Sequence, residues 1–558
     1  MGKGLEGNFM RWRSYVLPAF VLLALSVFVL YPITSVLLKS LAVKGQPGLG
    51  NYVTVFTKPH MVRTIWNSLW MAGAAACLST LLGLIIALTV YKTTLPVRRF
   101  FAFAAGLHMI IPGFVKSLAY VFLFGRNGLI TYKLLHITWD VYSWRSVLIL
   151  QTLGLATTTF LLISAMLSRV DSRVEDAARN LGATEWRVLT SVTLPLIRPA
   201  VISALLLAFL RSMGDFGTPF LIGGRFTTLA TSSYTLLIGT YNMEMASTLN
   251  VILLAFCLIV FGLYTRAQAA AANVRVQAEG NRGRALSLRK PVQVAMWTVS
   301  LLYSITMIML LASILFATFT KHLGADFTPT LEHLRILPQR GWNSTRNTVV
   351  FATTTSLTVT ALGIIIAYLV TRMDIRGKRA LDVLATLPFA IPGTFMGVGY
   401  ALAFSRPPLV MSGTWAIVIA CTVIRELPLG LRAGVSVLTH QDRAIEDASA
   451  NLGASRVTTF LRIILPLARP ALLVTALYAF VSTVKTLGAI IFLITPSSKV
   501  LSADVFEATQ AGSIGSASAM STVVILVAAL GILAILLINA REATQAWFLK
   551  VITGHTSD

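Results

Sequence analysis

The main pattern in this sequence is a series of long apolar runs separated by short polar segments. About twelve runs are long enough to cross a bilayer, for which a helix needs about 20 mostly apolar residues. They lie at approximately 15–38, 66–91, 100–123, 146–167, 200–222, 249–265, 292–317, 348–370, 380–404, 414–437, 471–494 and 520–540. The pattern predicts an all-α polytopic membrane protein with about twelve transmembrane helices, and it excludes a soluble enzyme.

Two polar segments interrupt the apolar pattern at corresponding places in the chain. One reads EDAARNLGATEWRVLTSVTLPLIRPA over residues 175–200, and the other reads EDASANLGASRVTTFLRIILPLARPA over residues 446–471. Matched residues in these segments are 271 positions apart throughout. Outside them, further matches lie 280 positions apart, namely Asn67 with Asn347, Gly83 with Gly363, and Ile111-Pro112-Gly113 with Ile391-Pro392-Gly393.

These matches divide the chain into two halves of similar organisation. We assign residues 1–265 to the first half, 266–291 to a linker rich in Ala, Gly and Arg, and 292–558 to the second half. Each half contains an even number of apolar runs, so both halves have the same orientation. The sequence therefore predicts a parallel repeat whose pseudo-twofold axis follows the membrane normal.

Each polar segment predicts a helix, a turn and a second helix. Asp171 is a suitable N-cap for the first helix. Gly182 and Gly453 lie where that helix must stop, because glycine readily takes the left-handed C-terminal conformation. Proline removes a backbone donor and clashes with the preceding turn, so we expect the second helix to end at a Leu-Pro pair. The two pairs are Leu194-Pro195 and Leu465-Pro466.

The charge distribution changes how the net charge of +25 is interpreted. Roughly twice as many Lys and Arg lie in segments on the side of the termini as in segments on the opposite side, and basic short loops favour the cytoplasm. We therefore expect both termini, the linker and both polar segments to be cytoplasmic. The charge is a topology signal, so lipid and not nucleic acid is the expected contact.

The polar segments resemble the EAA loop of the permeases of binding-protein-dependent ABC importers with the type I fold. The family pattern is E-A-A, three residues, Gly, nine residues and I-x-L-P. Here Asp replaces the Glu in both copies, Val192 replaces the Ile in the first copy, and Ser449 replaces an Ala in the second. In that family the loop is a cytoplasmic coupling helix, which docks on a separate ATPase subunit.

The resemblance implies coupling loops at about 171–199 and 439–470. The ATPase-coupling residues that it implies are Glu175, Asp176, Ala177, Ala178, Gly182, Leu194 and Pro195 in the first half, and Glu446, Asp447, Ala448, Gly453, Leu465 and Pro466 in the second. Two copies of a cytoplasmic ATPase and a periplasmic solute-binding protein are the implied partners. The implied function is solute import across a bacterial inner membrane by alternating access.

The sequence has no G-x-x-x-x-G-K-[ST] phosphate loop, so we expect no cofactor in this chain, with ATP and Mg²⁺ bound by the partner ATPase. The alternative class is an ion-gradient carrier. Such a carrier could have twelve spans and internal repeats, but it is not expected to carry two EAA loops.

The substrate is less well determined by the sequence. The fused two-half form, the sequence GDFGTP at 214–219 and the sequence IFLI at 491–494 are most similar to ferric-iron permeases. Relatives of similar form carry thiamine, polyamines, phosphonates or sugar phosphates, and these alternatives stay open. No cluster of His, Tyr and carboxylate residues is typical of an iron site, so we expect no metal site in the chain.

Charged residues within the apolar runs are candidates for the transport path, since a charge at a helix centre in the bilayer costs about 2.5–3.5 kcal/mol. These candidates are Arg211, Asp215, Lys485, Arg425 and Glu426. Arg211 and Asp215 are four positions apart and could pair on one helix face. The alternatives are structural pairs, either Arg425 with Glu426 or Asp215 with Lys485.

Two Pro-Gly pairs, at 112–113 and 392–393, predict kinks in their helices. Carbonyl groups freed by a kink must be satisfied inside the bundle. His108 and Lys116 lie on either side of the first pair, and the sequence leaves the roles of both open.

Overall fold

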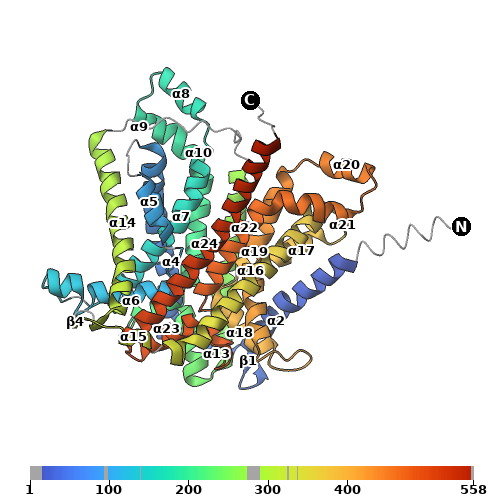
Figure 1. Cartoon of the computed structure of the whole chain (residues 1–558). Helices are drawn as coiled ribbons and strands as arrows, with labels where there is room; N and C mark the ends of the chain where they lie inside the picture. The colour runs from blue at the N-terminus through green and yellow to red at the C-terminus, as the bar shows by residue number, and fades with distance from the viewer. Residues whose placement is uncertain are drawn as a thin grey trace.

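The structure is a computed structural model that describes residues 16–93, 98–107, 109–138, 140–272, 289–322, 326–335 and 337–553. Long helices dominate it and run between two ends of the molecule (Figure 1). Within the described residues the strands form two short antiparallel hairpins, β1 (Ala42–Val43) with β2 (Gln46–Pro47) and β3 (Thr320–His322) with β4 (Asp326–Pro329). The predicted all-α class is confirmed.

The first half contains the helices from the N-terminal span to α13. Their bounds are Val16–Ser40 (which includes η1, Ser26–Leu30, and α2, Tyr31–Ser40), α3 Gly50–Thr57, α4 Pro59–Lys92, α5 Arg98–Leu107, α6 Gly113–Phe124, η2 Leu129–Leu134, α7 Trp144–Leu167, α8 Ser172–Asn180, α9 Glu185–Val188, η3 Leu189–Thr193, α10 Leu194–Met213, α11 Gly217–Ile222, α12 Leu229–Tyr234, η4 Thr235–Gly239 and α13 Met243–Ala272. The four η segments of this half are π-helical.

The second half repeats this order. Its helices are α14 Lys290–Thr318, α15 Glu332–Arg335, η5 Leu337–Gly341, α16 Trp342–Thr371, α17 Lys378–Thr386, η6 Leu387–Phe389, α18 Gly393–Ala403, α19 Trp415–His440, α20 Ala444–Asn451, α21 Arg456–Thr459, η7 Phe460–Ile464, α22 Leu465–Lys485, η8 Ile490–Phe492, α23 Leu501–Gln510 and α24 Ile514–Thr553. Of the η segments, η5 and η7 are π-helical, and η6 and η8 are 3₁₀-helical.

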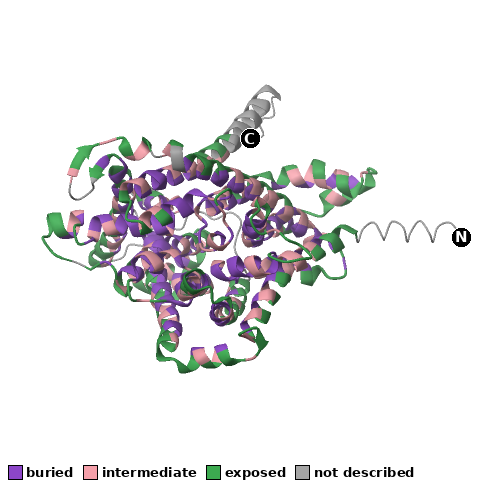
Figure 2. Cartoon of the chain, turned by 90° about the horizontal axis from the view of Figure 1, so that it is seen from below, coloured by how far each residue is buried: buried purple, intermediate pink, exposed green. Residues whose placement is uncertain are grey.

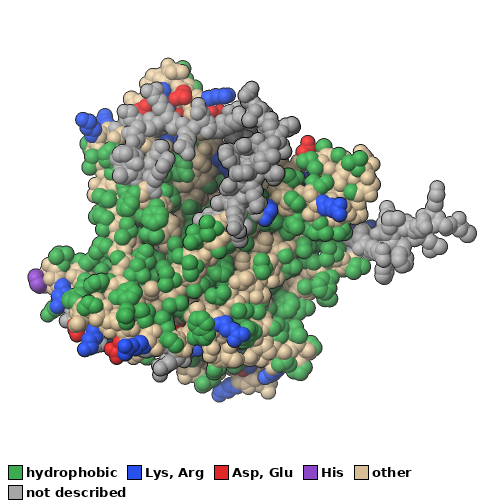
Figure 3. Space-filling view, in the orientation of Figure 1, with side chains coloured by type: hydrophobic (Ala, Val, Ile, Leu, Met, Phe, Trp, Pro, Cys, Tyr) green, Lys and Arg blue, Asp and Glu red, His purple; other side chains and the backbone are tan. Residues whose placement is uncertain are grey.

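The helices are long and apolar enough for a bilayer. Among the described residues, nine helices could cross a membrane, or ten when the bent pair Lys378–Phe389 and Gly393–Ala403 counts as one span. The two other predicted spans correspond to the α5–α6 pair and to α19, which carries charged residues within its apolar length. On the face shown in Figure 3, apolar side chains cover the middle, and Lys, Arg, Asp and Glu gather toward the two ends.

The two halves exchange their first helices. The N-terminal helix α2 packs against α13 of its own half and against α18 of the other half. In the same way, α14 packs against α24 of its own half and against α4, α5 and α6 of the other. Seen from below, the buried residues lie in the interior of this shared bundle (Figure 2). The halves are therefore parts of one bundle and not separate domains.

Matched glycines place the second span of each half directly on the fourth. A Cβ atom at Gly83 of α4 would lie 2.7 Å from the backbone nitrogen of Phe160 in α7. At the matched Gly363 of α16, a Cβ atom would lie 2.5 Å from the carbonyl carbon of Gly430 in α19. The same close backbone approach in both halves explains why these two positions are glycine.

Both ends of the predicted linker, 266–291, are helical where the structure describes them. Helix α13 continues to Ala272, and α14 already begins at Lys290. The sequence AQAAAA at 267–272 explains the extension, because alanine has the highest helix propensity. The rest of the predicted linker, residues 273–288, lies outside the described residues.

The glycine contacts predict unequal effects of one substitution at two positions of α4. Gly83→Ala should lower the free energy of unfolding by about 1–3 kcal/mol, because its methyl group meets the backbone of α7. Gly73→Ala meets no atom within 4 Å, so it should leave stability unchanged or raise it by up to about 1 kcal/mol. Unfolding of the purified variants in detergent, followed by SDS titration, measures both. Equal effects of the two variants would contradict this packing.

Candidate functional site

The first coupling loop has the predicted helix, turn and helix. Asp171 caps α8, and its Oδ1 accepts a hydrogen bond from the Arg173 backbone N–H at 2.9 Å. The helix ends at Asn180, and Gly182, two residues later, has a φ of +83°; the Ala183 N–H then donates to the Ala178 carbonyl at 3.0 Å. This is the Schellman arrangement that follows from a glycine just beyond the helix end.

The second coupling loop repeats this geometry. Gly453 follows α20 with a φ of +81°, and the Ala454 N–H donates to the Ser449 carbonyl at 3.1 Å. The hydroxyl of Ser455 then caps α21 by accepting from the Thr458 N–H at 3.2 Å. The predicted turn glycines are confirmed, and both loops lie at the same end of the bundle (Figure 1).

The Leu-Pro pairs do not end a helix, which corrects the sequence prediction. Residues Glu185–Met213 and Arg456–Lys485 are each continuous helices. A π-helical turn, η3 or η7, precedes each Leu-Pro pair, and the Leu194 N–H reaches back five residues to the Leu189 carbonyl. Leu465 bonds to Phe460 in the same way. We infer that the wider turn relieves the steric clash of proline with the preceding turn, so the helix continues.

The tip of each coupling loop exposes a leucine. Leu181 and the matched Leu452 are each 89% exposed. Two further apolar pairs at the same offset are also exposed: Val174 with Ile445, and Trp186 with Val457. Sequence reasoning missed these residues, although the fixed offset of 271 would have identified them. Together the six residues form matched apolar surfaces on polar loops.

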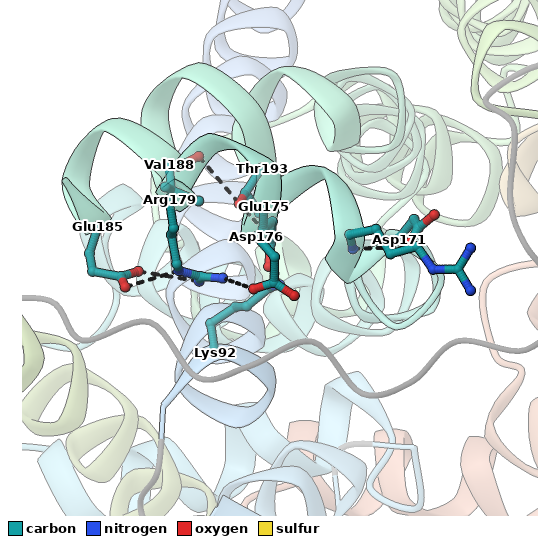
Figure 4. A network of polar contacts seen from close by, with 9 residues as sticks. Lys92, Asp171, Glu175, Asp176, Arg179, Glu185, Val188 and Thr193 are labelled. Carbon is teal, nitrogen blue, oxygen red and sulfur yellow. Dashed lines mark hydrogen bonds and ion pairs between the residues drawn. The ribbon is translucent and has the colours of Figure 1, made fainter. Parts of the chain in front are cut away.

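Glu175 does not contribute to that surface, because its side chain is completely buried. Lys92, at the end of α4, lies below it with Nζ 2.6 Å from Oε1 and 2.7 Å from Oε2 (Figure 4). The Thr193 hydroxyl, in η3, donates to the same carboxylate at 2.7 Å. Only 4% of the Lys92 side chain is exposed. Glu175 therefore joins the second span, the coupling helix and the π turn, instead of meeting a partner directly.

The second half contains the corresponding pair, Arg372 with Glu446. Arg372 is 280 positions after Lys92, which is the offset of the second spans, and Glu446 is 271 positions after Glu175. The Arg372 Nε lies 2.9 Å from the Glu446 Oε1, an ion pair that lacks hydrogen-bond alignment. Arg372 also donates to the carbonyls of Leu438 and Gln441, each at 2.7 Å. Sequence reasoning missed both cations because they lie at the ends of apolar runs.

A second polar network stiffens the first loop. Arg179 donates to Asp176 at 2.7 Å and to Glu185 at 3.0 Å, which ties α8 to α9 (Figure 4). Partial burial alone would lower the pKa of Arg179, but the hydrogen bonds to Glu185 and Asp176 raise it. The Asp176 carboxylate is thus hydrogen-bonded within the loop.

The other predicted coupling residues lie at or near the loop surface. Ala177, Asp447, Ala448, Pro195 and Pro466 are exposed. Ala178, Leu194 and Leu465 are partly buried and form the base of each loop.

Arg211 and Asp215 do not pair, which corrects a second expectation. Helix α10 ends at Met213, so Asp215 no longer follows the helical spacing that would place it beside Arg211. Asp215 accepts hydrogen bonds from Gln151 of α7 at 3.0 Å and from the Thr218 backbone N–H at 3.3 Å. The Arg211 guanidinium instead lies 5.6 Å from the Phe389 ring centre in the other half.

Arg425 and Glu426 make only a loose pair, with Nε and Oε1 4.0 Å apart. Glu426 instead accepts a 2.8 Å hydrogen bond from Ser482 of α22. Lys485, at the end of α22, lies near enough to Glu426 for electrostatic interaction. Among the ion pairs of the described residues, none joins Asp215 to Lys485, so these two residues do not form the structural pair that the sequence allowed.

Lys116 is buried on the first turn of α6 and lies near enough to Asp215 and Lys485 for electrostatic interaction. The helices on either side of the second Pro-Gly pair bend by 112°, so the predicted kink is a complete break. His108 lies outside the described residues. Lys116, Asp215, Gln151, Glu426 and Lys485 are called the polar cluster below, and they come from both halves.

An aromatic cluster adjoins the polar cluster, and sequence reasoning missed it. Phe216 and Phe220 of the first half lie 5.7 Å and 5.2 Å from Phe506 of the second, measured between ring centres. Tyr234 of the first half lies 5.7 Å from Phe492 of the second. These rings join the segments that follow the breaks after α10 and α22. Apolar rings with no common spacing give no signal in a sequence pattern.

The described residues contain no group of three His, Cys, Asp or Glu side chains placed to hold a metal ion.

Residues 79–272 and 359–543 match the family described as the binding-protein-dependent transport system inner membrane component, once in each half. The chain belongs to this family. It is therefore a multi-pass membrane permease subunit of an ABC importer and not the ATP-hydrolysing subunit. An ion-gradient carrier is the wrong class.

Three relatives give the similarity in more detail. The ferric transport system permease protein FbpB of Actinobacillus pleuropneumoniae is 30% identical over 522 residues, which cover 91% of this chain and 75% of that protein. A putative FbpB 1 of Haemophilus influenzae is 32% identical over 495 residues, which cover 86% and 78%. The molybdenum transport system permease protein ModB of Escherichia coli is 30% identical over 37% of this chain and 92% of ModB. One half of this chain thus corresponds to nearly a complete ModB.

The parallel repeat predicts that both coupling loops are accessible from one side of the membrane. In a background with Cys77, Cys257 and Cys421 replaced by serine, Leu181→Cys and Leu452→Cys should react with an impermeant maleimide from the same side. Val410→Cys, which follows α18 at the other end of the bundle, should react only from the opposite side. Labelling in right-side-out and inverted vesicles measures this. Reaction of the two loop cysteines from opposite sides would contradict the parallel repeat.

Proposed function

We propose that this chain is the permease of an ATP-driven ferric iron importer in a bacterial inner membrane. The observation that carries the proposal is the pair of coupling loops, which lie at the same end of the bundle (Figure 1) and expose matched apolar residues. The two FbpB relatives, whose names refer to ferric transport, are similar over most of the chain and support the choice of iron.

Each coupling loop is proposed to bind one copy of a cytoplasmic ATPase. Leu181 and Leu452 have almost no contact with this chain, and burying a leucine against a partner is worth about 1.5–3 kcal/mol. The same apolar groups recur at the same offset in both loops, so two identical subunits fit the two sites. ATP and Mg²⁺ are proposed to bind to those subunits, which supply the energy that this chain cannot obtain by itself.

The orientation follows from the loops and the charge. The excess of Lys and Arg on the side of the coupling loops supports a cytoplasmic location for that side and for both termini. The opposite end, which carries the β1–β2 and β3–β4 hairpins, is then periplasmic. We propose that a periplasmic binding protein delivers the solute to that end.

The proposed path runs between the halves, along the polar cluster. Lys116, Asp215, Glu426 and Lys485 are charged groups inside a bundle of apolar helices, and a purely structural core would not need them. Asp215 and Lys485 lie where α10 and α22 end, so carbonyl groups are also available there. We propose that iron is cargo for this path and is selected mainly by the binding protein.

Uptake by the reconstituted importer tests the function. Proteoliposomes that contain the chain, its ATPase and its iron-loaded binding protein should accumulate ⁵⁵Fe only with internal ATP. Leu181→Ala with Leu452→Ala should weaken ATPase binding by about 5- to 30-fold, because each truncation removes about 1–2 kcal/mol of interface energy. Iron uptake should fall with it. Val410→Ala, an exposed apolar truncation at the other end, should leave ATPase binding unchanged.

Other outcomes distinguish the alternatives. Uptake of thiamine, a polyamine, a phosphonate or a sugar phosphate in place of iron would refute the substrate and leave the importer class intact. Normal ATPase binding by the double variant would refute the docking surface.

A further inference from the structure

The second span of each half is bonded at both ends to segments that belong to different parts of the machinery. At the inner end, Lys92 of α4 and Arg372 after α16 hold the coupling loops through Glu175 and Glu446. Lys92 is buried with its partner, so the contact is not a loose surface pair. This inner contact exists in both halves at matched positions.

At the outer end of α4, adjacent residues hold the loop that follows the break after α10. The Asn67 side-chain amide donates to the Thr227 carbonyl at 3.0 Å. The next residue, Ser68, accepts a hydrogen bond from the Leu229 backbone N–H at 2.7 Å. Leu229 is the first residue of α12, and α12 carries Tyr234 of the aromatic cluster.

The outer end of α16 makes the same contacts in the second half. Asn347 donates to the carbonyls of Ser497 at 3.0 Å and Lys499 at 2.8 Å. The adjacent Thr348 accepts from the Leu501 N–H at 2.9 Å. Leu501 begins α23, which carries Phe506 of the aromatic cluster. Each second span is therefore held to a coupling loop by an ion pair at its inner end. At its outer end, two hydrogen bonds in the first half and three in the second hold a segment that packs the aromatic cluster.

The helix between these contacts can transmit displacement. Helix α4 runs from Pro59 to Lys92 without a break or an internal proline, and α16 runs without one from Trp342 to Thr371. About 25 residues separate the outer from the inner contact, which corresponds to about 37 Å at 1.5 Å per residue. A continuous hydrogen-bonded helix of this length moves as one body more readily than it bends.

We propose that α4 and α16 connect the coupling loops to the aromatic cluster, with Asn67 and Asn347 as positioning residues at the outer ends. This inference rests on the proposed function, in which the coupling loops receive the ATPase. A displacement of either coupling loop then shifts the segments that carry the aromatic cluster. This shift changes how Phe216, Phe220 and Tyr234 pack against Phe492 and Phe506. The cluster opens or closes the path in response to the state of the ATPase.

A cysteine at the break after α22, where the Thr486 carbonyl accepts a hydrogen bond from Ser502 of α23, measures this link. Thr486 is buried at the break after α22. Within the described part of the chain its hydroxyl bonds only to the Ser482 carbonyl, one turn earlier, so Thr486→Cys is a mild reporter. In a background free of other cysteines, an impermeant thiosulfonate is applied from the periplasmic side of the complex with ATPase and binding protein. Its reaction rate should differ at least about 5-fold between the nucleotide-free complex and the complex with a non-hydrolysable ATP analogue.

The variant that removes both outer contacts is Asn67→Ala with Asn347→Ala. It should bring the ratio of the two reaction rates to about one, and iron uptake should fall about 5- to 30-fold while ATPase activity stays within about twofold. The control is Ser79→Ala with Thr360→Ala, on the same two helices, because the bonds that these hydroxyls make to described residues stay within their own helix. The control should keep both the rate ratio and the uptake.

The outcomes separate this inference from the proposed function. If the asparagine variant keeps the nucleotide-dependent rate ratio and full uptake, the inference is wrong and the importer assignment stands. If the unmodified complex takes up no iron with ATP, the proposed function fails first. If the variant loses ATPase binding as well as uptake, the two asparagines stabilise the fold generally and the inference is also wrong.

Discussion

The structure depends on the buried ion pair between Lys92 and Glu175. Two charges removed from water cost several kcal/mol each, and only a close partner and further hydrogen bonds offset that cost. Here the Glu175 carboxylate receives both the Lys92 ammonium and the Thr193 hydroxyl. Each of the three residues belongs to a different element, α4, α8 or η3, so the electrostatic requirement fixes their arrangement. The coupling loop is thereby set against the end of the second span.

The repeat shows which parts of this arrangement are required. The second half keeps the carboxylate and the cation, as Glu446 and Arg372, although the polar surroundings differ. It also keeps the turn glycine, the π turn before the Leu-Pro pair and the exposed leucine at the tip. Of the two described loops, only the first contains the Arg179 network, so this network strengthens one loop without defining the motif.

Much of the fold was predictable because hydrophobicity and backbone chemistry are local. Apolar run length predicted the spans, glycine predicted the turn of each loop, and Asp171 was predicted as the cap of the first loop's helix. The π turn was not predictable, since proline was expected to end a helix and the relief of its clash depends on how the next turn continues. The Arg211–Asp215 pair was wrong because the i, i+4 rule holds only inside a helix, and α10 ends between them.

The candidate site was predictable in its loops and less so in its interior. Sequence separation hid the partner of Glu175, since Lys92 precedes it by 83 positions and terminates an apolar run. The two offsets, 280 for the second spans and 271 for the loops, would have paired Lys92 with Arg372 and Glu175 with Glu446. The contacts of the aromatic cluster required the three-dimensional arrangement, because its rings come from segments of both halves.

The pairing of Lys92 with Glu175 is the central claim, and a double-mutant cycle measures it directly. Lys92→Met, Glu175→Gln and the double variant are compared by their free energies of unfolding in detergent. Each single change strands a buried partner, so we predict a loss of about 3–5 kcal/mol for each and a coupling energy of about 2–3 kcal/mol. The more exposed Arg179–Glu185 pair, as control, should couple by less than about 1 kcal/mol. Effects at Lys92 and Glu175 that add within about 0.5 kcal/mol would contradict the account.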